Sequence, residues 1–181
     1  MKQTFTIDPA HSSANFSIRH LMITNVRGSF SNVTGTVVYD PANPSDSSIQ
    51  AEIDANSLST GDAQRDGHVK SPEFLHVEQH PKITFQSTKV EKTGDGEFKV
   101  TGNLTLHGTS KPVVLTIDGP TAETKDPWGN IRVGASATAK IKRSDFGVVW
   151  NATLETGGVA LSDDLKIELE LSLVKQQAAT A

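Results

Sequence analysis

Much of this chain alternates apolar and polar residues, the pattern of a β-strand with one buried and one solvated face. The longest examples are residues 98–106, 131–141 and 165–173. Residues 26–39 also predict one long strand. Shorter alternating segments begin at Phe5, Phe16, Ile49, Ile83 and Val113. Turn residues such as those at 93–96 separate many of these segments, so the pattern predicts about eight strands joined mostly by hairpins.

A sheet with one apolar face must cover that face, either by closing into a barrel or by packing against a second sheet. The long strands favour the barrel, because the strands of sandwiches are usually shorter. The predicted fold is therefore all-β: an extended, eight-stranded antiparallel barrel. At 181 residues the chain has the length of one domain. We assign the barrel to residues 1–175 and expect a frayed C-terminal tail at 176–181.

The alternation stops for long in only one place, where a short helical insert is predicted at about residues 60–78. Thr60 or Asp62 has the right side chain to cap a helix, and Pro72 fits the first turn of a second one. Pro81 then ends the insert. A helical segment of this size between two strands is suited to cover one end of a barrel.

An eight-stranded barrel is just wide enough to be filled by side chains or to hold one small ligand. Small residues recur on the predicted inner face, most clearly along residues 135–139. The phenylalanines either fill the space that these residues leave or line an elongated apolar cavity, and the pattern leaves both alternatives open. The residues predicted to line such a cavity are Phe16, Ile18, Phe30, Val37, Ile53, Phe74, Phe85, Leu104, Leu115, Ala135, Ala137 and Ala139.

Polar residues near one end of the barrel are candidates for holding the headgroup of an apolar ligand. Arg65 and His68 are three positions apart, so they share one face of the predicted helix. His20, at the end of the second strand, is a third candidate at the cavity mouth. The alternative is that Arg65 pairs with a carboxylate such as Asp62 or Glu73, which would give it a scaffold role.

The composition excludes several classes of function. A net charge of −4 argues against a basic footprint for nucleic acid and against electrostatic docking on anionic membranes. The absence of cysteine excludes disulfides and thiolate chemistry. No apolar run approaches the roughly 18 residues of a membrane span, so no stable membrane insertion is expected. Residues 1–6 do not resemble a signal peptide, so the chain is expected to be cytoplasmic, or periplasmic if a signal peptide has been removed.

His76 and His80 are four residues apart, as in some helical zinc sites. Pro81 follows at once, and no H-E-x-x-H motif accompanies them. Surface or helix-capping roles are therefore predicted for both histidines, and no metal site is expected.

Asp8, His11 and Ser12 carry the side-chain types of a hydrolase triad. Adjacent residues of an extended segment point to opposite faces, so His11 is poorly placed to activate Ser12. The chain also lacks a G-x-S-x-G motif. No catalytic residue and no enzymatic activity are predicted.

Six segments, in this order and spacing, resemble a known family. They are D-P-A-H-S-S-A-N-F-S-I-R-H (8–20), N-V-R-G-S-F (25–30), T-G-D-A-Q-R-D-G-H-V-K-S-P-E-F-L (60–75), H-P-K-I-T-F (80–85), T-G-N-L-T-L-H-G-T-S-K-P-V (101–113) and K-R-S-D-F-G-V (142–148). Together they resemble the YceI-like, polyisoprenoid-binding family, from about Phe5 to Val174. The resemblance leads us to expect an aromatic residue at the position of His80, and a histidine there is expected to make the cavity mouth more polar.

The resemblance implies a lipocalin-like barrel whose apolar tunnel holds a long isoprenoid chain, such as the tail of a quinone or of a quinone precursor. It implies a homodimer, no catalytic residues, and no cofactor beyond a bound polyprenyl lipid or quinone. The expected function is to bind such a lipid for transport, storage or quinone metabolism. Two alternatives stay open: an enzyme of unknown chemistry acting on an isoprenoid lipid, and a stress-response structural protein with a filled barrel.

Overall fold

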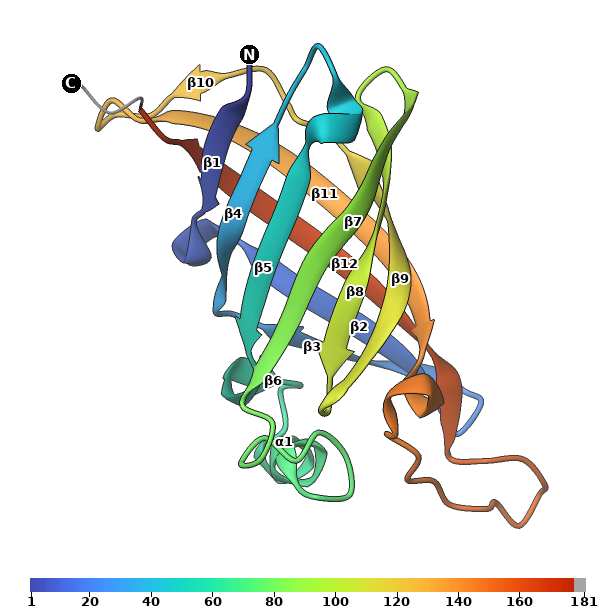
Figure 1. The fold of residues 1–181 in the computed structure, drawn as a ribbon. Coiled ribbons are helices and arrows are strands. Elements are labelled where there is room, and N and C mark those ends of the chain that lie inside the picture. Colours follow the sequence, from blue (N-terminus) through green and yellow to red (C-terminus); the bar gives the residue numbers. More distant parts are fainter. Residues whose placement is uncertain (178–181) are drawn as a thin grey trace.

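The computed structural model describes residues 1–177, most of them in one antiparallel sheet that wraps around a lumen (Figure 1). The strands are β1 Gln3–Ile7, β2 Ser13–His20, β3 Thr24–Phe30, β4 Val33–Tyr39, β5 Ser48–Asp54, β6 Leu58–Ser59, β7 Lys82–Gly94, β8 Glu97–Leu106, β9 Thr109–Asp118, β10 Thr124–Lys125, β11 Ile131–Lys142 and β12 Leu161–Lys175. The helices are α1 Ala63–Lys70 and the 3-10 turns η1 Pro9–His11, η2 Pro44–Asp46, η3 Ala55–Ser57 and η4 Arg143–Phe146. No helix within residues 1–177 is long and apolar enough to cross a membrane.

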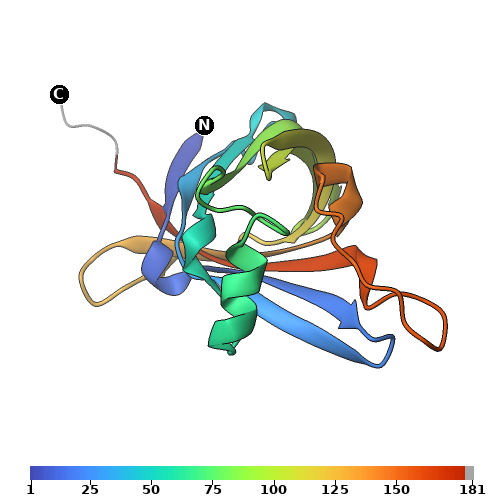
Figure 2. The same ribbon diagram turned by 90° about the horizontal axis from the view of Figure 1, so that it is seen from below.

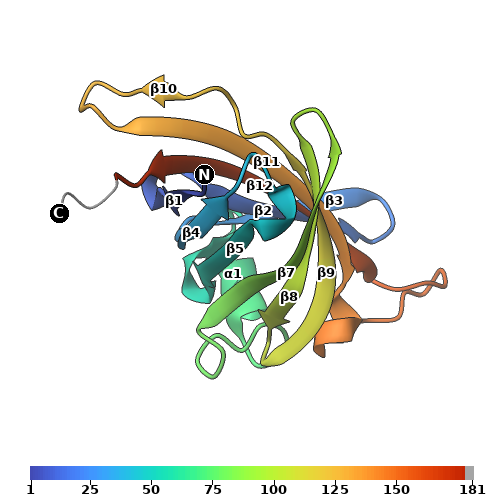
Figure 3. The same ribbon diagram turned by 45° about the horizontal axis from the view of Figure 1, so that its top comes forward.

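The sheet closes because β11 pairs with β12 over the whole stretch from Arg132↔Val174 to Lys142↔Asp164. Around the ring the order is β11, β9, β8, β7, β5, β4, β1 and β12, with every pair antiparallel. Figure 3 shows these strands curving around the lumen. The predicted all-β fold, an eight-stranded antiparallel barrel with one short helix, is confirmed.

The last strand, β12, has two different neighbours along one of its edges. Near its C-terminal end it pairs with β1, as in Ile7↔Leu173. Nearer its N-terminal end it pairs with β2, as in Phe16↔Ile167, and β2 in turn pairs with β3. The hairpin β2–β3 therefore extends the sheet beyond the ring, at the end of the molecule where α1 lies (Figure 1).

The alternation predicted one strand over residues 26–39, and this prediction is wrong, because the structure has two strands there. The segment breaks at Ser31 and Asn32, whose backbone N–H groups both donate to the Ser57 hydroxyl. The two halves have different partners: β3 follows β2 out of the ring, whereas β4 lies between β1 and β5. Buried Phe30 and Val33 are out of phase with each other, which is the mark of this break in the sequence.

The insert begins as predicted, with Asp62 as the cap of α1. Its Oδ1 accepts a hydrogen bond of 2.9 Å from the backbone N–H of Arg65. Thr60 has another role, because its backbone N–H and hydroxyl both donate to Asp66 Oδ1. The pKa of Asp66 is held below its usual value by these hydrogen bonds from Thr60 and, to a smaller extent, by the positive charges of Lys70 and Arg65.

Pro72 does not start a second helix. The backbone N–H groups of Leu75 and Val77 donate back to the carbonyls of Val69 and Lys70, at 3.0 and 3.1 Å. Residues 71–80 therefore form turns that fold against the end of α1, and the helical part of the insert is limited to α1. Hereafter the insert means residues 60–81.

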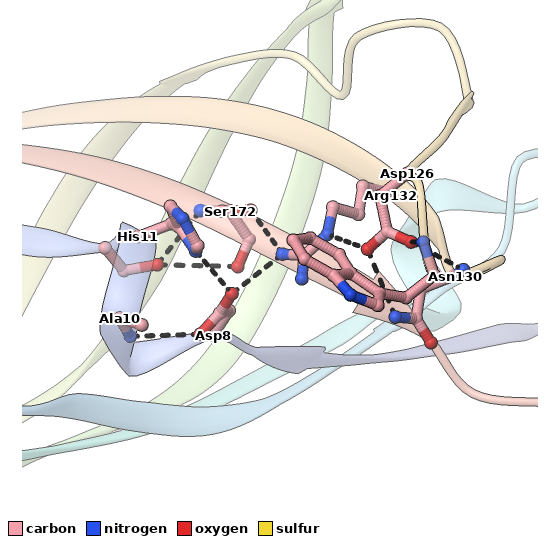
Figure 4. A network of polar contacts seen from close by, with 9 residues as sticks. Asp8, Ala10, His11, Asp126, Asn130, Arg132 and Ser172 are labelled. Carbon is pink, nitrogen blue, oxygen red and sulfur yellow. Dashed lines mark hydrogen bonds and ion pairs between the residues drawn. The ribbon is translucent and has the colours of Figure 1, made fainter.

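A polar network fastens the barrel at the end away from α1 (Figure 4). Arg132 donates to Asp8 Oδ2 and Asp126 Oδ2, each at 2.7 Å, and to Ser172 Oγ at 3.2 Å. The hydrogen bond from Arg132, followed by that from His11, lowers the pKa of Asp8 to about 2. The same guanidinium also holds the pKa of Asp126 far below its usual value. The network joins β1, the β10–β11 loop and β12.

The predicted fraying of the C-terminal tail does not begin at Gln176. Its backbone N–H donates to the Thr4 carbonyl at 2.8 Å, and its side chain donates to the Thr6 hydroxyl at 2.6 Å. The rest of the predicted tail, residues 178–181, lies outside the described residues.

Candidate functional site

A cavity of about 380 Å³ occupies the lumen from α1 up to Ile7 in β1. Apolar side chains from nearly every strand of the barrel line it, which is typical of pockets for apolar small molecules. Of the residues that the sequence predicted for such a cavity, the structure places ten on its wall: Phe16, Ile18, Phe30, Ile53, Phe74, Phe85, Leu104, Leu115, Ala137 and Ala139. The barrel is therefore not completely filled by its own side chains.

Val37 and Ala135 do not reach this cavity, contrary to the prediction. They line a second cavity of about 70 Å³ at the far end of the barrel. Four residues belong to the walls of both cavities: Ile49, Ile117, Ala137 and Leu171. Alternation predicted correctly that Val37 and Ala135 face inward, but it contains no information on how far along the barrel the space continues.

Two glycines of the inner face do not add open space. A Cβ on Gly28 would lie 2.2 Å from Cζ of Phe16, and a Cβ on Gly102 would lie 2.4 Å from Cζ of Phe85. Each aromatic ring therefore lies over the backbone of its glycine. The phenylalanines fill part of the lumen, and the alanines leave the rest.

The mouth of the larger cavity is its α1 end, where Thr60, Arg65, His68, Phe74 and Trp150 contribute to the wall (Figure 2 views the molecule from this end). Arg65 does not pair with Asp62 or Glu73. Its Nε donates to Thr60 Oγ1 at 2.9 Å and its Nη2 donates to the Thr60 carbonyl at 2.8 Å. Within residues 1–177, Arg65 therefore makes no direct ion pair, and Thr60 links it to Asp66.

His68 links the insert to the loop that follows η4. Its ring packs edge-on against Phe74 and Trp150, with centroids 4.9 and 5.1 Å apart, and its Nε2 contacts Glu73 Oε2. Phe74 and Trp150 also pack together, at 5.2 Å. This aromatic cluster forms an apolar rim with one polar edge. Trp150 comes from an irregular segment, and the alternation did not reveal it.

Arg143 is a buried cation at the mouth that the sequence analysis did not single out. It is 6% exposed and lines the cavity, and its guanidinium donates to the carbonyls of Ser162, Val148 and Trp150. Burial lowers the pKa of Arg143, and the negative charge of Asp163 partly offsets this decrease. Its position in K-R-S-D-F-G-V was the signal that could have found it.

His20 lines the cavity at the end of β2, as predicted. His80 does not, so the expectation that it makes the mouth more polar is wrong. Its ring packs instead against His107 and His76, with centroids 5.0 and 6.0 Å apart. Burial, His107 and His76 lower the pKa of His80, in that order.

Asp8, His11 and Ser12 do not form a hydrolase triad. Asp8 contacts His11 Nδ1 at 2.8 Å, but Ser12 exchanges its hydrogen bonds with the backbone of Ser172. Asp8 is committed to Arg132 as well. Within the described residues, no three or more His, Cys, Asp or Glu side chains are grouped as metal ligands.

The comparisons with known proteins agree with this architecture. The family model described as the YceI-like domain matches residues 5–173, so the chain belongs to the YceI-like family. It is similar to protein YceI of Salmonella newport, with 41% identity over 88% of this chain and 81% of that protein.

Solved structures of the same fold are also similar. The YceI protein of Campylobacter jejuni has a TM-score of 0.73 and 31% identity, over 88% of this chain and 90% of that one. A polyisoprenoid-binding domain from Saccharophagus degradans has a TM-score of 0.67, over 95% of this chain and 98% of that one. At 17% identity the latter supports the fold alone.

Proposed function

We propose that this protein binds a long-chain polyisoprenoid, or a similar amphiphilic lipid, with its tail in the larger cavity. The observation that carries the proposal is the cavity itself, which is lined almost throughout by apolar side chains and bordered by polar groups at its mouth. The domain from Saccharophagus degradans, which has a similar fold, is a polyisoprenoid-binding domain, and our proposal gives this chain the same class of ligand.

The energetics suit a long tail. Burial of one CH₂ group contributes about 0.8 kcal/mol, so a five-carbon unit contributes roughly 3–4 kcal/mol before costs. Association itself costs about 4–15 kcal/mol. A tail of one or two units therefore binds weakly, whereas several units bind tightly without a strong polar anchor.

The headgroup belongs at the mouth in this proposal. His20, Arg65 and His68 line the cavity and are the candidates to contact the headgroup, and Arg143 adds a second guanidinium. Two cations beside an apolar rim favour a headgroup rich in oxygen acceptors, such as a quinone or a phosphate ester. Transport, storage and quinone metabolism are the roles in which such a complex would serve, and the homodimer implied by the family resemblance stays a prediction.

The test is native mass spectrometry of freshly purified protein, followed by organic extraction. We expect a bound lipid with a polyprenyl tail, whose mass also identifies the headgroup. Protein that is recovered empty and then takes up no polyprenol from detergent would contradict the proposal. Incubation with the extracted lipid separates binding from catalysis, because only an enzyme converts it to a product.

A further inference from the structure

The turn between β2 and β3 exposes three consecutive apolar side chains. Leu21, Met22 and Ile23 are 39%, 62% and 69% exposed. The backbone N–H of Ile23 donates to the His20 carbonyl at 3.0 Å, and the two residues between them, Leu21 and Met22, both have positive φ angles, 53° and 61°. Such turns strongly favour Asn-Gly, since other residues adopt this conformation uncommonly. Large apolar residues here are unfavourable for both backbone and solvation, which points to a function.

The loop after η4 adds apolar residues at the same end of the molecule (Figures 1 and 2). Val149 is 66% exposed and Val159 is 40% exposed. The loop is held to the hairpin, because the Leu21 N–H donates to the Ala160 carbonyl at 2.8 Å. Together the two segments carry five of the eight large hydrophobic side chains that are exposed within residues 1–177. We call Leu21, Met22, Ile23, Val149 and Val159 the hairpin patch.

The hairpin patch is continuous with the mouth of the cavity. His20, which precedes Leu21, lines the cavity, and so does Ala160, which follows Val159. Val149 lies between two further lining residues, Val148 and Trp150. The same segments therefore present one side to the cavity and the other to solvent.

The β2–β3 hairpin is positively charged, although the whole chain is acidic and the segment from η4 to β12 contains Asp145 and Glu155. Residues 13–30 contain Arg19 and Arg27 and no Asp or Glu. Both arginines are exposed, and Arg19 also donates to the Met22 carbonyl. On neighbouring β12, Asp163 accepts hydrogen bonds from Ser144, and Asp164 pairs with Lys140.

We propose that the hairpin patch docks this protein peripherally on the surface of an anionic phospholipid bilayer, with the apolar turn entering the interface and the arginines facing the phosphates. The proposal rests on the proposed function, since a bilayer is where a long apolar lipid resides and docking would bring the cavity mouth against it. It differs from membrane insertion, because only side chains of a turn and a loop enter the lipid. The overall charge of −4 argues against docking by the charge of the whole molecule, but here the apolar turn makes the contact, and charges beyond about 10 Å are screened at physiological salt.

The sharpest test is the double substitution Leu21→Asn with Met22→Gly, assayed by flotation with vesicles of phosphatidylcholine containing phosphatidylglycerol. This change supplies the residues that the turn prefers, so we expect the melting temperature to stay the same or rise. Binding to these vesicles should fall by about tenfold or more, because two apolar side chains are lost. Arg27→Gln should weaken binding to the anionic vesicles and leave binding to pure phosphatidylcholine unchanged.

Matched controls are Val114→Ser and Trp128→Ser, which remove exposed apolar side chains, 44% and 80% exposed, away from the patch. Both should bind vesicles like the wild type. Equal vesicle binding by the wild type and the double variant overturns the proposal. So does a wild type that ignores vesicles but changes from dimer to monomer with the double substitution, which would identify the patch as an interface between copies.

Failure of the proposed function gives a different result. If the cavity takes no lipid, polyprenol delivered from detergent will not bind, whether or not the patch docks on vesicles. If only the docking fails, the double variant will take up polyprenol from detergent and from vesicles as fast as the wild type does.

Discussion

Single glycines decide how wide the lumen is. Gly28 lies opposite Phe16 on the neighbouring strand, and the absence of a Cβ lets the tip of the ring lie close to the β3 backbone. Rings that fold over a glycine in this way pin the register of a sheet. The same ring also forms part of the cavity wall. A side chain at position 28 would therefore push the ring into the space that a ligand would occupy.

Gly28→Ala should therefore push the Phe16 ring into the cavity. We expect a loss of about 1–3 kcal/mol in the free energy of unfolding, as for other overpacked cores. Thermal and urea unfolding measure it. Gly67→Ala is the control, because nothing lies within 4 Å of a Cβ there and alanine in a helix should stabilise by about 0.5–1 kcal/mol. A Gly28→Ala variant as stable as the wild type would show that the ring moves without cost.

At the scale of elements, the insert is fastened to the barrel by different contacts on its two sides. On the inner side, His68 and Phe74 pack against Trp150. On the other side, the His80 ring packs against both His76 and His107; His107 follows β8, and its Nδ1 contacts the Phe146 carbonyl. This second contact therefore rests on imidazole rings, and the pKa of one of them, His80, is lowered.

The pKa of His80 lies below its ordinary value of 6.5, so the unfolded chain takes up a proton at this residue before the folded chain does. The stability that neutral His80 contributes is therefore complete above pH 6.5 and is lost as the pH falls through the folded pKa. We expect the melting temperature to fall between about pH 7 and pH 5, and to fall less in His80→Phe. Identical pH profiles for the two proteins would rule out this role.

Strand β11 offers a direct test of the cavity. Ala139 faces the larger cavity, whereas its neighbour Thr138 is exposed on the outer face. Ala139→Trp should block binding of a polyprenyl lipid while the barrel still folds, because the indole takes the space of the tail. Thr138→Trp adds the same ring on the outside and should bind like the wild type. Fluorescence displacement measures both affinities, and normal binding by Ala139→Trp would refute the cavity as the site.

The whole barrel sets how much of a tail can be buried. β11 has twelve residues, which at about 3.4 Å each and a tilt of about 40° span roughly 30 Å along the axis. An isoprene unit extends about 4–5 Å by the reach of an extended chain, so about six units fit if the tail enters both cavities. Ala137 lines both cavities and is 2% exposed.

Affinity should therefore rise with each isoprene unit and level off at about six, because apolar burial is roughly proportional to area. Calorimetry with one headgroup and tails of increasing length tests this expectation. In Ala137→Trp the rise should stop earlier, while the shortest tails bind as in the wild type. An affinity that does not depend on tail length would mean that the headgroup alone is recognised.

Residue order along the chain was enough to predict the strands and the direction of their side chains, because a strand's two faces alternate with a period of two whatever its neighbours are. Phe16, Ile18 and Ala139 face inward for that reason. The cap of α1 was predictable too, since Asp62 binds a backbone N–H only three residues away. Closure into a barrel followed from the length of the strands and from the need to cover one apolar face.

Contacts between distant segments decided the rest. The break at Ser31 and Asn32 depends on which strands β3 and β4 pair with, and both choices lie elsewhere in the chain. Arg143 and Trp150 reach the mouth from an irregular segment. Such a segment has no regular alternation of side chains from which their direction could be predicted. His80 turns away from the cavity because His107, twenty-seven residues later, packs against it. The alternation of side chains depends only on neighbouring residues, whereas cavities and side-chain clusters depend on contacts between residues that are distant in the sequence.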